Sequence, residues 1–65
     1  MKIFLNGKET ETSKKNISGL LSELGIKTEG AAVEVNLQIV RKKDYEGFAL
    51  KEGDRVEIVN FVGGG

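Results

Sequence analysis

Three consecutive glycines, Gly63 to Gly65, are the part of this 65-residue sequence with the most evident chemical use. They follow Arg55 to Val62, a run rich in β-forming side chains, so a packed strand is expected to end abruptly in a thin segment. Extended, three glycines span roughly 10 Å, and without side chains they could carry the carboxylate of Gly65 into a channel too narrow for other residues. The alternative interpretation is a frayed terminus without function.

The rest of the composition offers no conventional catalytic group. The chain contains no cysteine and no histidine, which excludes disulfides, zinc and iron–sulfur sites, a cysteine nucleophile and a histidine base. A domain of 65 residues also leaves little room for a deep pocket. We therefore expect no catalytic residue, no metal site and no bound cofactor, and we do not expect this chain to be an enzyme.

Charge and hydropathy exclude two further classes of partner. Ten basic and ten acidic residues cancel, whereas nucleic-acid binding normally requires a basic surface. The basic run Arg41–Lys43 is followed by Asp44 and Glu46, which indicates a solvated loop. No apolar stretch approaches membrane-spanning length, and the N-terminus lacks the apolar segment of a signal peptide. The sequence thus predicts a cytoplasmic protein that binds neither nucleic acid nor membranes.

A hairpin and one short helix are predicted in the first part of the chain. Residues 2–5 and 8–12 indicate two strands joined by Asn6-Gly7, the preferred dipeptide for a type I′ turn. Asn16 is placed to cap a helix, and Gly25 to end it in a left-handed conformation. The stripe that should pack this helix on a sheet consists of Ile17, Leu20, Leu21 and Leu24.

Three more strands are predicted in the second part. Residues 31–35 alternate, with valines on one face and Glu34 on the other, and residues 38–41 continue after a turn. An irregular segment anchored by Tyr45 and Phe48 follows, and a turn at Gly53 leads into the last strand.

The order of these elements indicates an α+β fold, in which one helix covers one face of a mixed sheet of four to five strands. The simplest arrangement places the last strand beside the first, parallel to it, in the centre of the sheet. This is the β-grasp, or ubiquitin-like, architecture. We expect a single β-grasp domain over residues 1–62 and a flexible glycine tail over residues 63–65.

Several segments together resemble the ThiS family, the sulfur-carrier proteins of thiamin biosynthesis, within the ubiquitin-like superfamily that also includes MoaD. The resemblance covers essentially the whole chain, and the strand Gly-Asp-x-Val-Glu-Ile followed by a Gly-Gly terminus is its most specific part. A third glycine, Gly63, is the one departure. The segments that carry the resemblance are Asn6-Gly7, Leu20-Leu21, Leu24-Gly25, Val33-Glu34-Val35-Asn36, Leu50 to Val59, and Gly64-Gly65.

The resemblance implies a chemistry that needs no reactive side chain of this protein. In the ThiS family, an E1-like adenylyltransferase (ThiF-like) uses ATP and magnesium to adenylate the terminal carboxylate, which here is on Gly65, next to Gly64. A persulfide sulfur donor then displaces AMP and leaves a thiocarboxylate. The sulfur is delivered to thiazole synthase (ThiG-like). These three proteins are the implied partners, and the free carrier is expected to be a monomer.

Alternation along the last strand predicts a docking surface for these partners. If Val56 and Ile58 face the helix, then Glu57, Val59 and Phe61 face away, just before the glycines. The alternative is that Val59 and Phe61 cover a second core on that side. The predicted partner-binding residues are Val59, Phe61, Val62 and Gly63, with Glu34 and Asn36 on the outer face of the neighbouring strand as a polar rim.

Other functions remain open on the sequence. The small subunit of molybdopterin synthase shares the expected fold, tail and thiocarboxylate chemistry, although such chains are usually longer. A ubiquitin-type modifier would use the same activated glycine to form an isopeptide bond with a lysine. A plain interaction domain would leave the tail idle.

Overall fold

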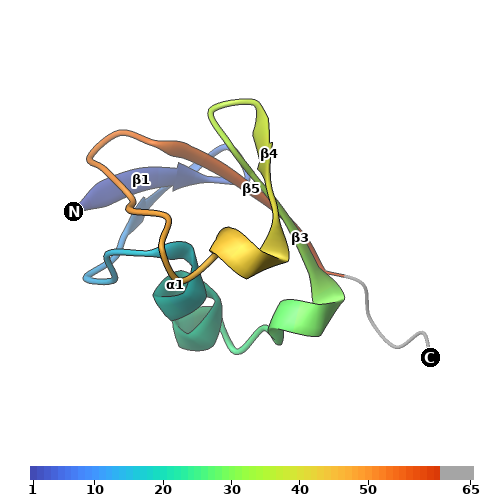
Figure 1. Ribbon diagram of the computed structural model, residues 1–65. Helices are drawn as coiled ribbons and strands as arrows, with labels where there is room; N and C mark the ends of the chain where they lie inside the picture. Colours follow the sequence, from blue (N-terminus) through green and yellow to red (C-terminus); the bar gives the residue numbers. More distant parts are fainter. Residues whose placement is uncertain (61–65) are drawn as a thin grey trace.

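The structure is a computed structural model that describes residues 1–60. These residues form a five-stranded mixed sheet with helices connecting its strands (Figure 1). The strands lie side by side in the order β2-β1-β5-β3-β4. One α-helix and two short 3-10 helices connect them. The elements are β1 (Lys2–Leu5), β2 (Lys8–Glu11), α1 (Ile17–Leu24), η1 (Thr28–Gly30), β3 (Ala31–Val35), β4 (Gln38–Val40), η2 (Lys42–Asp44) and β5 (Arg55–Asn60).

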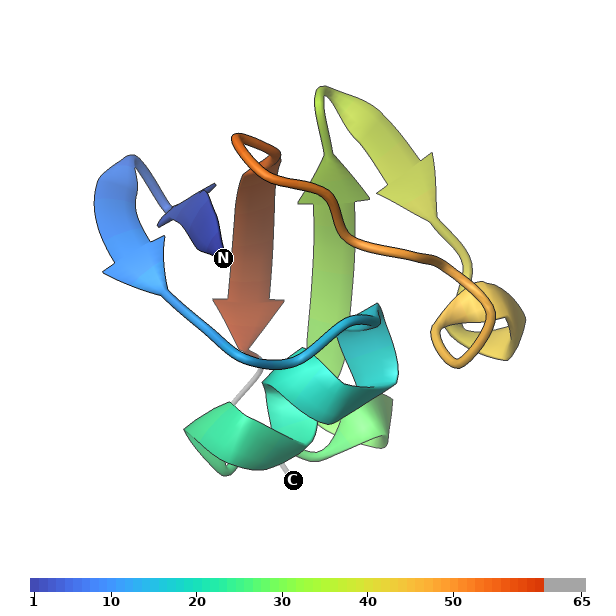
Figure 2. The ribbon, with the colours of Figure 1, turned by 90° about the vertical axis from the view of Figure 1, so that its left-hand side faces the viewer.

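Two strands in the interior of the sheet, β1 and β5, form a parallel pair, although they are the first and last strands in the sequence. β1 pairs with β5 in parallel, with Phe4 opposite Arg55, and β5 pairs with β3 in the antiparallel direction. Helix α1 lies on one side of the sheet in both views (Figures 1 and 2). This arrangement confirms the predicted β-grasp fold.

Two hairpin turns have the backbone conformation of type I′. Asn6 and Gly7 have φ of 50° and 81°, as their sequence predicted. Asn36 and Leu37 have φ of 51° and 71°. Leucine is unusual here because its Cβ approaches the backbone in the left-handed region. Leu37 is also 88% exposed, so this turn gains no core packing in return.

Helix α1 begins and ends at the predicted residues. The Asn16 side-chain oxygen accepts a hydrogen bond of 2.7 Å from the Gly19 N–H, and Gly25 ends the helix with φ of 74°. The Ile26 N–H then donates to the Leu21 carbonyl at 2.9 Å, which closes the C-terminal turn. Within residues 1–60, no helix has the length and apolar character needed to cross a membrane.

The core lies between α1 and the sheet, and one predicted member is missing from it. Leu20 and Leu21 are buried as expected, but Leu24 is 39% exposed, so its assignment to the core was wrong. The reason is that Gly25 turns the chain and Ile26 packs against the core instead. The buried apolar side chains are Ile3, Ile17, Leu20, Leu21, Ala31, Val33, Val35, Val40, Tyr45, Leu50, Val56 and Ile58.

The segment between β4 and β5 is anchored by the two aromatic residues that the sequence indicated. Tyr45 is buried and its hydroxyl donates to the Ala31 carbonyl at 3.3 Å, while Phe48 packs at the margin of the core. Burial raises the pKa of the Tyr45 hydroxyl above its ordinary value. The turn before β5 has Gly53 at φ of 84°, and the Asp54 carboxylate accepts from the Lys51 N–H at 2.8 Å. The turn at Gly53 was predicted.

Candidate functional site

Strand β5 fixes the point from which the glycine segment continues. It lies between β1 and β3, with Val56 and Ile58 buried against the core. Its last residue, Asn60, is still paired with Ala31 of β3. The predicted sites at Phe61, Val62, Gly63, Gly64 and Gly65 lie outside the described residues, so their roles stay predictions.

Asn6 holds β5 in place by a contact that sequence reasoning missed. Its N–H donates to the Val56 carbonyl at 2.8 Å. Its side-chain oxygen accepts from the Ile58 N–H at 2.8 Å, and its side-chain NH₂ donates to the Ile58 carbonyl at 3.3 Å. The Asn6 side chain thus continues the β1–β5 ladder beyond the end of β1. A turn signal alone could not reveal this contact, because Ile58 is 52 positions away.

We expect the substitution Asn6→Gly to loosen β5 while the turn itself is retained. Glycine accepts the φ of 50° at this position but leaves the Ile58 N–H and carbonyl without their side-chain partner. The free energy of unfolding should fall by about 1–3 kcal/mol, the range for losing such hydrogen bonds in a partly buried place. Native-state hydrogen exchange should show faster exchange of the Ile58 amide.

A matched control is Leu37→Gly, which places a glycine in the other type I′ turn. Leu37 has φ of 71°, so glycine should relieve backbone strain there and keep or raise the stability. Unchanged protection of the Ile58 amide in Asn6→Gly would contradict the role given to Asn6.

The face of the sheet opposite α1 carries the residues that alternation placed there. Glu57 and Val59 are exposed, and Val59 at 56% exposure shows that no second core of described residues covers it. On this face the register sets Val59 beside Ala32, and Glu34 between Glu57 and Ile39. Side chains here border a hollow of about 190 Å³. The outer-face patch, as we call it, consists of Ala32, Glu34, Ile39, Glu57 and Val59.

The structure places one predicted rim residue elsewhere. Asn36 follows β3 in the turn, where its side chain donates to the Asp54 carboxylate and accepts from the Arg55 N–H, each at 3.0 Å. Because β3 and β5 are antiparallel, this turn lies beside the start of β5, at the opposite end from Asn60. Asn36 therefore does not lie on the outer face of β3, contrary to the expectation, whereas Glu34 does. The role of Glu34 in partner binding stays a prediction.

Ile39 and Ala32 are patch residues that sequence reasoning did not select. Ile39 is 78% exposed, and alternation with the buried Val40 could have placed it outward. Ala32 alternates in the same way with Val33. Neither residue lies on β5, the strand that leads into the glycines and from which the docking surface was predicted.

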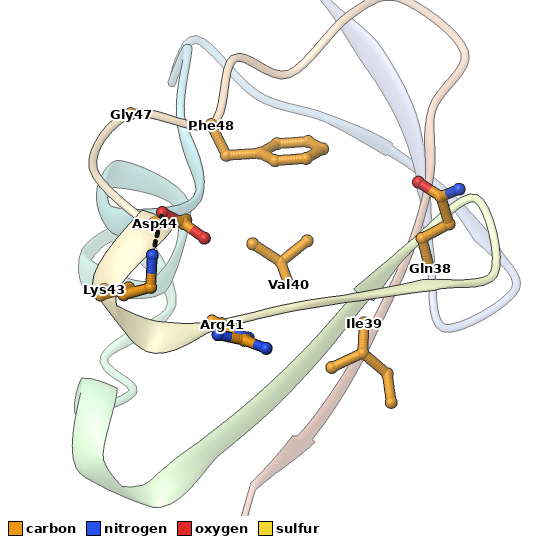
Figure 3. Close-up of a pocket in the computed structure, with 8 residues that line it drawn as sticks. All are labelled: Gln38, Ile39, Val40, Arg41, Lys43, Asp44, Gly47 and Phe48. Carbon is orange, nitrogen blue, oxygen red and sulfur yellow. Dashed lines mark ion pairs between the residues drawn. The ribbon is translucent and has the colours of Figure 1, made fainter.

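A larger hollow lies on the other side of β4 and has a different character. It is an open groove of about 490 Å³ toward which Val40 and Phe48 point, while Ile39 points away (Figure 3). Lys43 and Asp44 at its margin form an ion pair of 3.6 Å. Among residues 1–60, no cluster of three or more potential metal ligands occurs here or elsewhere. This groove therefore presents no donor set for a metal.

Taken together, the sheet order, the parallel pairing of β1 with β5 and the helix α1 on one face define a small ubiquitin-like β-grasp domain. The sequence model of the ThiS family matches residues 3–65. The chain is 38% identical to the sulfur carrier protein ThiS of Bacillus subtilis, over 94% of this chain and 96% of that protein. The crystal structure of the thiamine biosynthesis protein ThiS from Geobacter metallireducens matches with a TM-score of 0.83 and 32% identity, over the full length of both chains. The chain belongs to the ThiS family.

A much longer protein also matches the whole chain. The chain is 46% identical, over 66 residues, to a thiazole synthase of Paramagnetospirillum magneticum. The match covers 100% of this chain but only 20% of that protein. The chain therefore spans about a fifth of the length of this relative.

Proposed function

We propose that this chain is a sulfur carrier of thiamin biosynthesis and that its working group is the carboxylate of Gly65. The observation that carries the proposal is the match, over nearly the full length of both chains, to a protein named as a sulfur carrier. The terminal sequence Gly63-Gly64-Gly65 supports it, because a thin segment suits entry into a narrow active site.

The proposed chemistry has three steps. A carboxylate is a poor electrophile, so an E1-like adenylyltransferase (ThiF-like) first transfers AMP from magnesium-bound ATP to the Gly65 carboxylate and releases pyrophosphate. The terminal sulfur of a persulfide donor then displaces AMP, and cleavage of the sulfur–sulfur bond by a thiol leaves the thiocarboxylate. Thiazole synthase (ThiG-like) finally takes up the sulfur. We expect this transfer to take place in the cytoplasm, where ATP is plentiful.

In this scheme the carrier positions the Gly65 carboxylate and contributes no reactive side chain. The chain has no cysteine or histidine, so the nucleophile and the sulfur come from its partners. Strand β5, held by β1, β3 and the Asn6 side chain, gives the glycine segment a fixed origin. The carrier is thus a substrate of two enzymes and not itself an enzyme.

Thiazole synthase is the partner with the most direct support. A relative named thiazole synthase contains a stretch that matches the whole of this chain. Joining two proteins in one chain raises their effective concentration, which benefits partners that must meet in each reaction cycle.

The proposal is tested by intact-mass spectrometry after incubation with the activating enzyme, magnesium, ATP and a persulfide donor. We expect one oxygen atom at Gly65 to be replaced by sulfur only when ATP is present. The added sulfur should be lost again when thiazole synthase is added. High-mass adducts through lysine would indicate a ubiquitin-type modifier instead. Transfer of the sulfur only to a molybdopterin synthase would indicate the MoaD-type function, and an unchanged mass would reject sulfur carriage altogether.

A further inference from the structure

Two acidic residues of the outer-face patch lie directly opposite each other. Glu34 and Glu57 are partners in the antiparallel register of β3 and β5, and both project from the face away from α1. Like charges in this position destabilise a sheet. The domain therefore retains a pair that its own folding disfavours.

No described residue compensates this pair. Among residues 1–60, no ion pair or side-chain hydrogen bond involves either carboxylate. Arg55 lies on the same strand, but its guanidinium group is placed over the Phe4 ring, 6.0 Å from the centroid, on the β1 side. The charge on Glu34 and Glu57 is therefore left to solvent or to a partner.

The two carboxylates border a hollow whose other lining residues are apolar. Ala32 is the smallest side chain of the patch and lies opposite the exposed Val59 of β5, while the exposed Ile39 of β4 lies opposite Glu34. These residues and the two glutamates surround the hollow of about 190 Å³. An apolar stem with a cationic end fits such a surface, as the long side chains of lysine and arginine do.

The patch is also close to the point from which the glycine segment continues. Val59 and Ala32 are one ladder position from Asn60 and Ala31, the last described pair of β5. A partner held on the patch is thereby held next to the origin of that segment.

We infer that the outer-face patch docks thiazole synthase through an arginine or lysine of that enzyme. Its alkyl stem occupies the hollow lined by Ala32, Ile39 and Val59, and its charge lies between Glu34 and Glu57. This inference rests on the proposed function. Thiazole synthase is the proposed partner because a relative of that name contains a stretch that matches this chain. Charge complementarity of this kind relieves the repulsion in the free domain and adds specificity to the complex.

Removal of either negative charge should stabilise the free domain and weaken its complex with thiazole synthase. Glu34→Gln and Glu57→Gln keep the shape of the side chain and remove the repulsion. The melting temperature should stay the same or rise. The dissociation constant for thiazole synthase should increase about tenfold for each variant, and its dependence on salt should decrease.

The test measures binding of the full chain and its variants to purified thiazole synthase by calorimetry, at low and high salt. Glu46→Gln is the matched control, because it removes the same charge from an exposed loop outside the patch. It should bind like the unaltered chain. Unchanged affinity in Glu57→Gln, or equal losses in Glu46→Gln, would overturn the inference.

Two further results separate this inference from the proposed function. If the unaltered chain forms no thiocarboxylate in the mass assay, the proposed function fails. If it forms the thiocarboxylate but the Glu34→Gln and Glu57→Gln variants lose affinity only for the activating enzyme, the function stands and the assignment of the patch to thiazole synthase is wrong.

Discussion

Removal of Gly65 is expected to slow activation of the carrier by about a hundredfold or more while the fold remains intact. The deletion shortens the glycine segment by roughly 3.5 Å. A displacement near 1 Å can already cost about a hundredfold in rate, since the reacting atoms no longer meet. Gly65 has no side chain that could be buried, so thermal unfolding should not change. The measurement is ATP–pyrophosphate exchange with the activating enzyme.

The last three residues are all glycine. The deletion therefore shortens the glycine segment without removing a side chain. A chain with one additional glycine should also be activated slowly, because its carboxylate overshoots the nucleotide. Glu46→Gln keeps the length and alters an exposed loop outside the outer-face patch, so it is the control, for which we expect exchange at the normal rate. A normal rate in the shortened chain would mean that the tail is idle and that this is a binding domain.

Leu21→Ala is expected to unfold much of the population near physiological temperature. Leu21 is 1% exposed between α1 and the sheet, and truncation of such a leucine costs about 2–5 kcal/mol. A small domain has only about 5–15 kcal/mol of stability in total. Thermal unfolding followed by circular dichroism should show a large decrease in melting temperature.

Leu24→Ala in the same helix is the matched control for this experiment. Leu24 is 39% exposed, so the same truncation should cost about 1 kcal/mol or less. Equal losses in the two variants would show that the helix packs differently from the structure described.

Local signals predicted the elements of this fold well. The cap at Asn16, the left-handed Gly25 and the Asn6-Gly7 turn each depend on a few neighbouring residues, and all three are confirmed. Leu24 was misplaced because its burial depends on where the chain goes after the helix, and Ile26 takes that position. Asn36 was misplaced because alternation was extended one residue beyond the end of β3.

The candidate site was less predictable because it depends on contacts between distant residues. Alternation showed that Glu34 and Glu57 face outward, but only the register shows that they lie opposite each other. The bond between Asn6 and Ile58 likewise requires the parallel pairing of β1 with β5. The roles of Phe61, Val62 and the glycines belong to the part of the chain that the structure does not describe.

The parallel pair of β1 and β5 also has a consequence for the life of the protein in the cell. The sheet cannot close around β5 until residues 55–60 have left the ribosome, since β1 and β3 do not pair with each other. A chain whose synthesis stops earlier would expose two open sheet edges, which invite aggregation and degradation. Closure of the sheet is thereby coupled to the synthesis of residues 55–60.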